Sequence, residues 1–382
     1  MTDAAGYGLD HLPYGVFSTP ERDPRVGVRF EDSVLDLAAA TGRPEFAQPS
    51  LNAFIALGAD EWAETRAALP ALIETGAHRH PLDEVTLHLP IEVGDYVDFY
   101  ASEQHASNVG RMFRPDQEPL LPNWKHLPVG YHGRSGTVVA SGTDIIRPCG
   151  QRKAPTEDAP SYGPSRRLDI EAELGFVVGV GTKLGERVST GAFKDHTFGV
   201  VGLNDWSARD IQAWEYVPLG PFLGKSFATS ISNWITPLAA LDNAWTDLPG
   251  QDPEPLDYLA VGERAGLDIT VEVVLNGVVV SRPPYASMYW APAQMLAHTT
   301  VNGASVRTGD LWGSGTISGS EPDQRGSFLE LSWGGKEPFL VDGVERTFLE
   351  DGDEVTLRYT ARGTSGGTIT LGEVTGRILP AT

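Results

Sequence analysis

Carboxylate side chains alternate with apolar ones in the stretch 168–174 (LDIEAEL). If this stretch is a β-strand, successive side chains point to opposite faces, so Asp169, Glu171 and Glu173 share one face. Glu171 and Glu173 would then lie about 6.6 Å apart, two residue rises along the strand. Apolar residues follow at 176–178, and unpaired carboxylates next to a core are unfavourable. The acidic face is therefore either a solvated sheet surface or a surface that faces a positive group.

A histidine that could act as a base follows a short strand pattern in the stretch 95–105 (DYVDFYASEQH). A strand through Asp98 and Tyr100 places these two side chains on one face. Ser102 is a suitable N-cap for a helix that has His105 in its first turn. Because the positive end of the helix dipole disfavours the protonated ring, His105 is a candidate general base. Taken alone, such a histidine is more often a hydrogen-bonded structural residue.

A second carboxylate and a polar helix face follow in the stretch 201–216. An apolar strand ends at Asp205, and Ser207 can cap the helix that comes next. Three polar side chains then share one face at helical spacing: Arg209, Gln212 and Tyr216. An ordinary capped helix with a polar surface is the alternative interpretation.

The stretch 311–319 (LWGSGTISG) is rich in glycine, which lets backbone approach a ligand closely but is equally common in a tight hairpin. Downstream, Glu330 lies between Leu329 and Leu331 in a strand pattern. Its side chain would point away from theirs, and it could orient a base.

The elements that must position these residues fall into two parts. Alternating apolar residues at Val26, Val28 and Phe30 predict a half-buried strand within a small mixed module of about ninety residues. A change of pattern near His88-Leu89-Pro90 predicts a domain boundary, with domains at 1–90 and 91–382. Short strands alternate with turns after Val93, including an Asn-Gly hairpin turn at 276–277. The fold class predicted is mainly β, of the α+β type.

Composition narrows the class of protein further. The 382 residues include 43 glycines and 28 prolines, which favours a turn-rich β architecture. The net charge of −22 argues against nucleic acid or an anionic membrane as a partner. Cys149 is the single cysteine, so no intrachain disulfide can form and a reducing compartment is favoured. Residues 1–5 lack the pattern of a signal peptide, and no apolar stretch approaches the ~18 residues of a membrane span, so we expect a cytoplasmic protein.

Together these stretches resemble the fumarylacetoacetate hydrolase family. The resemblance covers most of the chain after residue 90, in the family's order: 95–110, 121–133, 168–174, 204–227, 288–290, 314–321 and 329–333. It implies a small N-terminal SH3-like mixed domain followed by a large C-terminal β-sandwich or β-roll domain. It also implies hydrolysis of the carbon–carbon bond of 4-fumarylacetoacetate to fumarate and acetoacetate, the last step of tyrosine and phenylalanine breakdown.

The resemblance assigns a metal site to four carboxylates: Asp98, Glu171, Glu173 and Asp205. Oxygen ligands without cysteine or histidine suit a hard ion, Mg²⁺ or Ca²⁺. Lys225 and Thr229 match positions close to this site. A cation would also remove the repulsion within the acidic face.

Catalytic and substrate-binding roles come from the same resemblance. His105 matches the general base and Glu330 the residue that orients it. Matches to stabilisers of negative charge are Arg209, Gln212 and Lys225. Matches to substrate contacts are Tyr100, Arg114, Tyr131, Tyr216 and Thr316. Two departures from the family pattern are Ala228 in place of glycine and Ser320 in place of proline. The partners expected are a small diketo-acid substrate and a second copy of the chain in a homodimer.

Two alternatives stay open at this stage. One is a related hydrolase of the same superfamily that acts on acylpyruvates or other diketo acids. The other is a β-rich binding protein without catalytic activity, whose cation is structural. Metal-dependent loss of a diketo acid would separate the enzymes from the binding protein.

Overall fold

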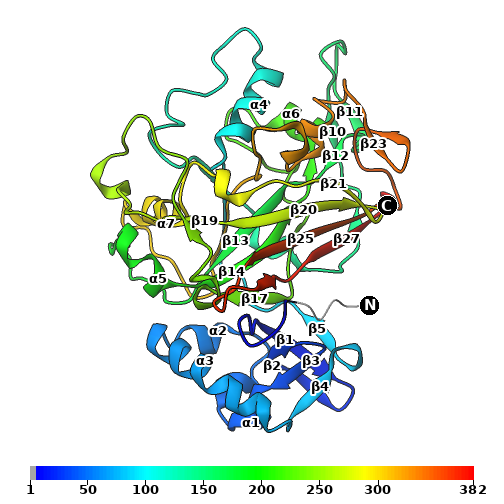
Figure 1. Ribbon diagram of the computed structural model, residues 1–382. Coiled ribbons are helices and arrows are strands. Elements are labelled where there is room, and N and C mark those ends of the chain that lie inside the picture. The colour runs from blue at the N-terminus through cyan, green and yellow to red at the C-terminus, as the bar shows by residue number, and fades with distance from the viewer. Residues whose placement is uncertain (1–5) are drawn as a thin grey trace.

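The computed structural model describes residues 6–382, and Figure 1 shows a small N-terminal part below a larger C-terminal part. The N-terminal part contains these strands and helices: β1 (Tyr14–Thr19), β2 (Arg22–Phe30), β3 (Ser33–Asp36), β4 (Arg79–Pro81), β5 (Thr86–His88), α1 (Leu37–Thr41), α2 (Asn52–Ile55) and α3 (Ala59–Glu74). The β2–β3 hairpin confirms the strand predicted around Val26–Phe30. Phe46, Phe54 and Leu69 are fully buried in its core.

The strands of the N-terminal part are continuous with the main sheet of the C-terminal part. Tyr14 of β1 pairs with Ile235 of β17, so one sheet runs in the order β4-β3-β2-β1-β17-β14-β13-β22-β6-β7. Its C-terminal strands are β17 (Trp234–Pro237), β14 (Thr197–Asp205), β13 (Ala172–Val178), β22 (Leu311–Gly313), β6 (Tyr96–Phe99) and β7 (Gly130–His132). Off this path, β16 (Thr229–Ile231) pairs with β14 and with β8 (Val138–Ala140). His11 is fully buried where the two parts meet and bonds Thr236 of β17 at 2.7 Å.

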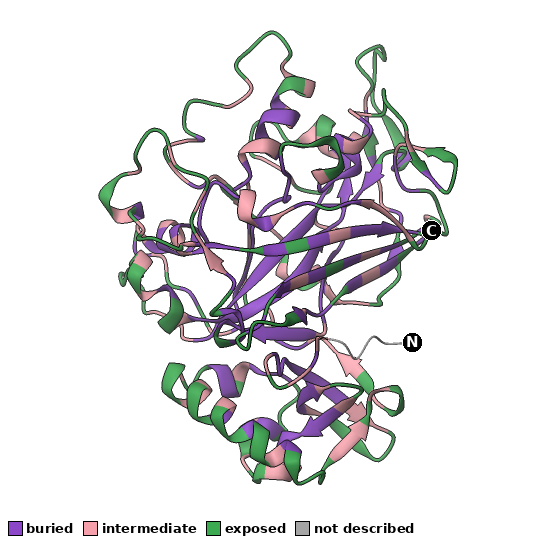
Figure 2. Cartoon of the chain, in the orientation of Figure 1, coloured by how far each residue is buried: buried purple, intermediate pink, exposed green. Residues whose placement is uncertain are grey.

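A second sheet packs across β13 and β14 (Figure 1). Its strands are β21 (Val278–Ser281), β20 (Ile269–Leu275), β25 (Glu354–Arg362), β27 (Val374–Leu379), β9 (Ile145–Ile146) and β26 (Thr368–Thr370). Tyr359 of β25 joins the sheets, because its buried hydroxyl donates to the backbone oxygen of Glu173 at 2.9 Å. Every residue of β13 and β14 is buried, as Figure 2 shows along the centre of the molecule. The two layers bear out the prediction of a mainly β fold with a large C-terminal domain of sandwich type.

Helices and short strand pairs surround these sheets. The helices are α4 (Glu103–Phe113), α5 (Phe193–His196), α6 (Arg209–Glu215), α7 (Pro292–Thr300) and α8 (Phe328–Leu331). The short pairs are β10 (Cys149–Arg152) with β11 (Ser161–Pro164), β12 (Leu168–Asp169) with β15 (Ser207–Ala208), β18 (Trp245–Thr246) with β19 (Gly266–Leu267), and β23 (Phe339–Val341) with β24 (Val344–Arg346). In Figure 1, α4 and α6 lie at the same end of the molecule.

Three local predictions were wrong. The stretch 168–174 is not one continuous strand, because Ile170 and Glu171 separate β12 from β13. Glu330 lies in the short helix α8 rather than in a strand. Ser207 does not cap α6, because it belongs to β15 and its hydroxyl donates to the backbone oxygen of Asp205 at 2.9 Å. Contacts with distant segments override these local patterns, because β12 pairs with β15 and the Asp169 carboxylate accepts from the Phe328 N–H at the start of α8.

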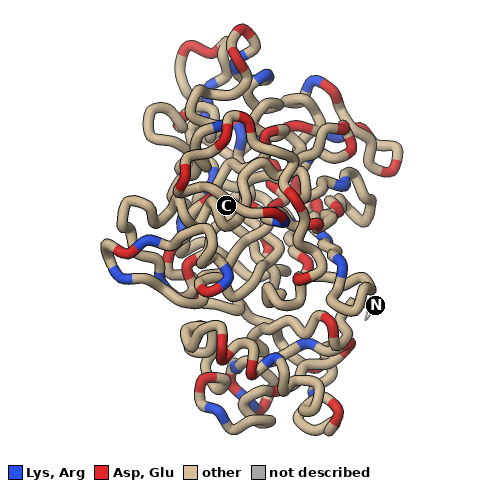
Figure 3. The backbone as a smooth tube through the Cα atoms, turned by 60° about the vertical axis from the view of Figure 1, so that its left-hand side comes forward, with Lys and Arg blue, Asp and Glu red and all other residues tan. Residues whose placement is uncertain are grey.

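Charge is distributed over the whole chain. In Figure 3, acidic and basic positions occur in both the N-terminal and the C-terminal part. Within residues 6–382, no helix has the length and apolar character that crossing a membrane requires. The expectation about a signal peptide concerns residues 1–5 and lies outside the described residues.

Candidate active site and metal centre

The structure brings together the four carboxylates at the upper end of the main sheet. Asp98 comes from β6, Glu171 from the link before β13, Glu173 from β13 and Asp205 from the last position of β14. One ligand oxygen from each residue lies within 4.8 Å of the others. All four side chains are buried, with at most 6% of their surface exposed. The solvated acidic surface considered from the sequence is therefore wrong.

Two cationic side chains hold one side of the carboxylate cluster. The Lys225 Nζ lies 2.5 Å from Glu171 Oε2 and 3.0 Å from Asp205 Oδ2. Arg209 Nη1 lies 2.7 Å from Glu171 Oε1. Although burial raises the pKa of Glu171, Lys225 and Arg209 outweigh this effect and hold its pKa below the usual range. Glu171 is therefore an anion at neutral pH.

Hydrogen bonds orient Asp205 at the end of β14. The Tyr131 hydroxyl donates to Asp205 Oδ2 at 2.7 Å, and the Thr229 hydroxyl donates to Oδ1 at 2.8 Å. Thr229 is placed opposite Asp205 by the pairing of β16 with β14. Both tyrosine and threonine therefore fix a carboxylate of the cluster through direct contacts.

On the other side of the cluster, Asp98 and Glu173 form no ion pair within residues 6–382. Asp98 Oδ1 and Glu173 Oε1 are buried and have no hydrogen-bond partner there. Burial raises the pKa of Asp98 well above its usual range, and repulsion from Asp205 raises it further. Burial and the neighbouring Asp98 do the same to the pKa of Glu173. A divalent cation between these oxygens would remove both penalties, and an all-oxygen donor set suits Mg²⁺ or Ca²⁺.

Glycines let the backbone come close to these carboxylates. A Cβ at Gly313 would lie 2.6 Å from Glu173 Oε2 and 2.8 Å from Asp98 Oδ1. The backbone N–H of Gly315, which has a φ of +78°, donates to Glu173 Oε2 at 2.9 Å. Of the two interpretations of the glycine-rich stretch, the structure thus supports a close approach of the backbone to the carboxylates.

His105 and Glu330 form a buried pair beside the cluster. The Ser102 hydroxyl accepts from the His105 backbone N–H at 3.2 Å, which confirms the predicted N-cap of α4. His105 Nδ1 lies 2.6 Å from Glu330 Oε2, and both side chains are nearly inaccessible at 3% and 0% exposed. Burial raises the pKa of Glu330, but the attraction of His105 and hydrogen bonds from His105 and Asn108 lower it overall. Since Glu330 holds Nδ1, Nε2 is the ring nitrogen left to take up a proton.

Sequence reasoning missed the polar residues that hold Glu330. Ser318 and Ser327 donate to its Oε2 at 2.9 and 2.8 Å, and Asn108 donates to Oε1 at 2.9 Å. Ser327 is also the N-cap of α8, accepting from the Glu330 N–H. The pattern Ser327 to Glu330 matches a capping box and could have signalled this short helix.

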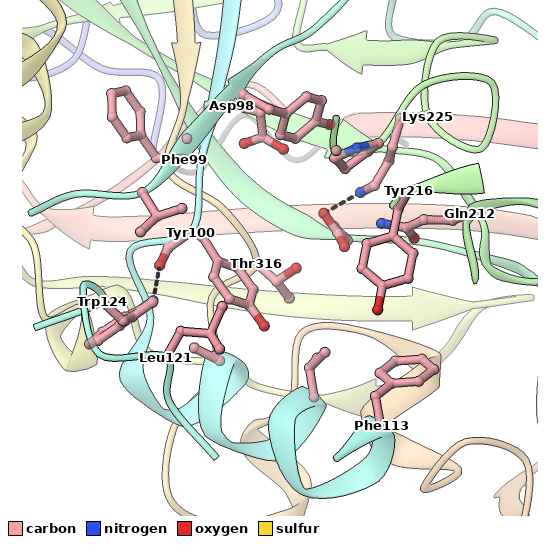
Figure 4. A pocket seen from close by; sticks show the side chains of 18 of the residues that line it. Asp98, Phe99, Tyr100, Phe113, Leu121, Trp124, Gln212, Tyr216, Lys225 and Thr316 are labelled. Atoms are coloured by element: carbon pink, nitrogen blue, oxygen red, sulfur yellow. Dashed lines mark hydrogen bonds and ion pairs between the residues drawn. The ribbon is translucent and has the colours of Figure 1, made fainter. Parts of the chain in front are cut away.

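A cavity of about 460 Å³ opens over the cluster. Figure 4 shows Gln212, Tyr216 and Lys225 along one side and Tyr100 and Trp124 along the other. The cavity brings together these predicted residues: Asp98, Glu171, Arg209, Gln212, Lys225, Tyr100, Arg114, Tyr131, Tyr216 and Thr316. Apolar walls of the cavity come from Phe113, Leu121 and Trp124. The sequence had not indicated a role for these three residues.

Several polar atoms around the cavity are buried without a partner among residues 6–382: Arg209 Nη2, Arg114 Nε and Thr316 Oγ1. The Arg114 Nη2 donates to the backbone oxygen of Pro119 at 2.9 Å, which fixes the guanidinium at the end of α4. His105 and Glu330 do not line the cavity, but the Tyr100 ring packs edge-on to His105 at 5.3 Å and does line it. Unpaired buried donors in a cavity of this size are typical of a site for a polar small molecule.

The two-layer β fold places a buried carboxylate cluster that could hold a cation beside a buried His–Glu pair. Comparison with protein families identifies the class of protein. Residues 10–90 match the model described as fumarylacetoacetase N-terminal, and residues 96–378 match that described as fumarylacetoacetate hydrolase C-terminal. The chain therefore belongs to the fumarylacetoacetate hydrolase family.

Curated relatives match over almost the whole chain. Fumarylacetoacetase of Homo sapiens is 45% identical over 411 residues, covering 100% of this chain and 98% of that protein. Fumarylacetoacetase of Arabidopsis thaliana is 45% identical over 406 residues, covering 98% of this chain and 96% of that protein. The expected family is thus confirmed.

Solved structures share the fold at lower sequence identity. A fumarylacetoacetate hydrolase from Exiguobacterium antarcticum is 18% identical with a TM-score of 0.60, covering 97% of this chain and 99% of that one. Maleylpyruvate hydrolase from Sphingobium is 16% identical with a TM-score of 0.58, covering 97% and 100%. These two similarities establish the fold alone.

Proposed function

We propose that this protein hydrolyses the carbon–carbon bond of 4-fumarylacetoacetate to give fumarate and acetoacetate. The curated relatives named fumarylacetoacetase, at about 45% identity over nearly the full chain, support this activity. The observation that carries the proposal is the buried carboxylate cluster beside the His105–Glu330 pair, with Asp98 and Glu171 of the cluster lining the cavity. A cation held by Asp98, Glu171, Glu173 and Asp205 would act as a Lewis acid toward the two oxygens of the 1,3-diketo group.

His105 is the general base in this proposal. Its Nε2 takes a proton from water while the water oxygen forms a bond to the carbonyl carbon next to the fumaryl double bond. The pair of electrons of the carbonyl π-bond moves to the oxygen, which becomes an oxyanion. Glu330 stabilises the imidazolium through the 2.6 Å contact to Nδ1. The proton is thus held where the next step needs it.

Collapse of the tetrahedral species breaks the bond between the fumaryl carbon and the acetoacetyl carbon. The electron pair of that bond goes to the acetoacetyl part as an enolate, and the imidazolium of His105 returns its proton to the carbon. Lys225, Gln212 and the unpaired Nη2 of Arg209 are positioned to meet the negative charge as it develops. Atoms and charges balance with water as the co-substrate.

The remaining polar groups of the cavity suit the two carboxylates of the substrate. Arg114 provides a guanidinium whose Nε has no hydrogen-bond partner within residues 6–382. Thr316 provides a buried hydroxyl that also has no hydrogen-bond partner there. Tyr100 and Tyr216 supply phenols at the wall, which Tyr131 also lines while its hydroxyl donates to Asp205. Such fixed donors orient a flexible dianion and exclude water from the reacting carbons.

Finer parts of the proposal concern the ion, the assembly and the location. We expect Mg²⁺ or Ca²⁺, because the donor set is all oxygen.

The homodimer implied by the family resemblance is supported by exposed apolar side chains near the cavity, with Val217 at 65%, Leu219 at 95% and Phe222 at 57% exposed. Light scattering of the purified chain should give twice the monomer mass, and a monomer mass would contradict it. A cytoplasmic location belongs to the same expectation and can be checked by fractionating cells.

The direct test is to follow the diketo absorbance of 4-fumarylacetoacetate and to quantify fumarate and acetoacetate by chromatography. Wild-type protein should release both products in equal amounts, and His105→Ala should lower kcat by about 10²–10⁴-fold. His126→Ala is the matched control, because the His126 side chain is exposed, whereas His105 is buried against Glu330. Acylpyruvates in the same assay test the related hydrolase. Faster turnover of an acylpyruvate, or wild-type kcat in His105→Ala, would contradict the proposal.

A further inference from the structure

Asp169 is a buried carboxylate that the mechanism above does not use. It is 0% exposed and does not line the cavity. Backbone pairing of β12 with β15 places Asp169 opposite Ser207, two residues before Arg209. Its position therefore follows from the same short strand pair that introduces α6.

The Asp169 carboxylate accepts hydrogen bonds from two parts of the candidate site. Its Oδ2 accepts from Arg209 Nε at 2.7 Å and from the Leu329 N–H at 3.0 Å. Its Oδ1 accepts from the Phe328 N–H at 2.7 Å and from the Ile170 N–H at 2.8 Å. One side chain thus joins the guanidinium of α6 to the first turn of α8.

The contact to Arg209 fixes the plane of its guanidinium. Asp169 binds Nε, while Nη1 contacts Glu171 at 2.7 Å and Gln212 at 3.3 Å. The buried Nη2 is left as the donor without a partner among residues 6–382, and Arg209 lines the cavity. Because the guanidinium is planar, holding two of its nitrogens determines where the third one points.

The contacts to α8 fix the helix that carries Glu330. The N–H groups of Phe328 and Leu329 belong to the first turn of this four-residue helix, where backbone donors have no partner within the helix. A carboxylate at this end satisfies two of them. Asp169 and the N-cap Ser327 together set the angle at which Glu330 reaches His105.

We propose that Asp169 is a positioning residue that couples the charge-stabilising Arg209 to the His105–Glu330 pair. This inference rests on the proposed function, because both groups must act in one reaction for their coupling to matter. Asp169 touches neither the cavity nor the reacting atoms, so it acts through its two partners. Its loss should misplace the oxyanion donor and the base at once.

The test is Asp169→Asn, which keeps the volume but replaces an acceptor oxygen by a donor. Because all four partners of the carboxylate are N–H groups, the amide nitrogen meets a donor in either orientation. We expect kcat to fall by about 10–10²-fold with KM changed by less than about threefold, since the affected contacts act in the transition state. Hydrogen exchange of the segment 328–331 should also become faster.

A double-mutant cycle separates positioning from a general loss of structure. If Asp169 acts partly through Arg209, adding Asp169→Asn to Arg209→Lys should lower kcat by a smaller factor than Asp169→Asn does in the wild-type protein. The same should hold in the Glu330→Gln background. Asp36→Asn is the matched control, because Asp36 is equally buried, accepts from the Ala39 N–H and pairs with arginine in the N-terminal part. It should lower stability and leave kcat unchanged.

The outcomes distinguish this inference from the proposed function. A wild-type protein that does not hydrolyse the diketo acid refutes the proposed function. An active wild type with a folded Asp169→Asn variant of unchanged kcat refutes the inference, and so do fully additive losses in the cycle. If Asp169→Asn does not fold, Asp169→Glu keeps the charge and moves it by one methylene, and its kcat should fall at least fivefold. Wild-type kcat in Asp169→Glu would equally overturn the positioning role.

Discussion

Replacing Glu330 by glutamine removes one negative charge and almost no volume from the buried partner of His105. In the wild-type protein, Glu330 Oε2 faces His105 Nδ1 at 2.6 Å and also accepts from Ser318 and Ser327. If the amide oxygen of glutamine faces Nδ1, the tautomer is kept but the imidazolium loses its counter-charge. If the amide nitrogen faces Nδ1, that ring nitrogen must become an acceptor, and Nε2 then carries a hydrogen and cannot take up a proton.

The size of the effect follows from the first of these two arrangements, which is the milder one. A hydrogen bond to a charged group contributes about 1.5–3 kcal/mol, which corresponds to a loss of roughly 10- to 150-fold in kcat. The reversed tautomer would add to this loss, toward the ~10⁴-fold upper range for a general base. KM should change little, because the imidazolium forms during the reaction and not on substrate binding.

The assay is steady-state hydrolysis of 4-fumarylacetoacetate, with kcat and KM determined separately and folding checked by circular dichroism. Glu337→Gln is the control for the same substitution at an exposed position. A folded Glu330→Gln variant with wild-type kcat would refute the role of the pair. A rise in KM at constant kcat would instead assign Glu330 to substrate binding.

Two further predictions concern backbone approach and pH. Gly313→Ala would place a methyl carbon 2.6 Å from Glu173 Oε2, so we expect the affinity for Mg²⁺, measured by calorimetry, to fall by about 10–10²-fold. Gly262→Ala is the control and should bind Mg²⁺ normally, because no atom lies within 4 Å of the added methyl group. Equal affinities of the two variants would contradict the proposed position of Glu173 as a ligand. Burial, and to a smaller extent the nearby arginines, lower the pKa of His11 from 6.5 to about 3. Between these two pH values the unfolded chain binds a proton that the folded chain does not. The free energy of unfolding therefore falls as the pH drops from 6.5 toward 3. Between pH 8 and 5.5 the free energy of unfolding should fall by about 1.4 kcal/mol because of His11. In urea unfolding, His11→Gln should abolish this part of the pH dependence, and the exposed control His126→Gln should keep it. An unchanged pH dependence in His11→Gln would show that His11 is not buried in its neutral form.

Local sequence signals predicted the elements that depend on neighbouring residues. The N-cap Ser102 and the hairpin turn at Asn276-Gly277 were both predicted, and both are present. Asn276 and Gly277 have φ values of 52° and 82°, a conformation that asparagine and glycine adopt at low energy. In such cases the stabilising contact lies within a few residues, so the sequence contains all of it.

Elements held by distant contacts could not be predicted in this way. The stretch 168–174 alternates as a strand should, but the Ala172 N–H bonds Gly326 and the Glu171 N–H bonds Asn204, which interrupts the ladder. The helix α8 is too short to show a helical period, and its first turn depends on Asp169, 159 residues earlier in the chain. The convergence of Asp98, Glu171, Glu173 and Asp205 was predicted from the family resemblance, because no spacing in the sequence relates three separate segments.

Hydrolysis by the proposed mechanism requires a cation held by the carboxylate cluster beside His105. The most direct measurement is the rate of 4-fumarylacetoacetate hydrolysis by protein stripped with a chelator, titrated with Mg²⁺ or Ca²⁺, with fumarate and acetoacetate quantified. We predict negligible hydrolysis before addition and a saturable recovery with one ion per chain, lost again in Glu171→Gln. Full hydrolysis by the stripped protein, or recovery that does not depend on Glu171, would contradict the account.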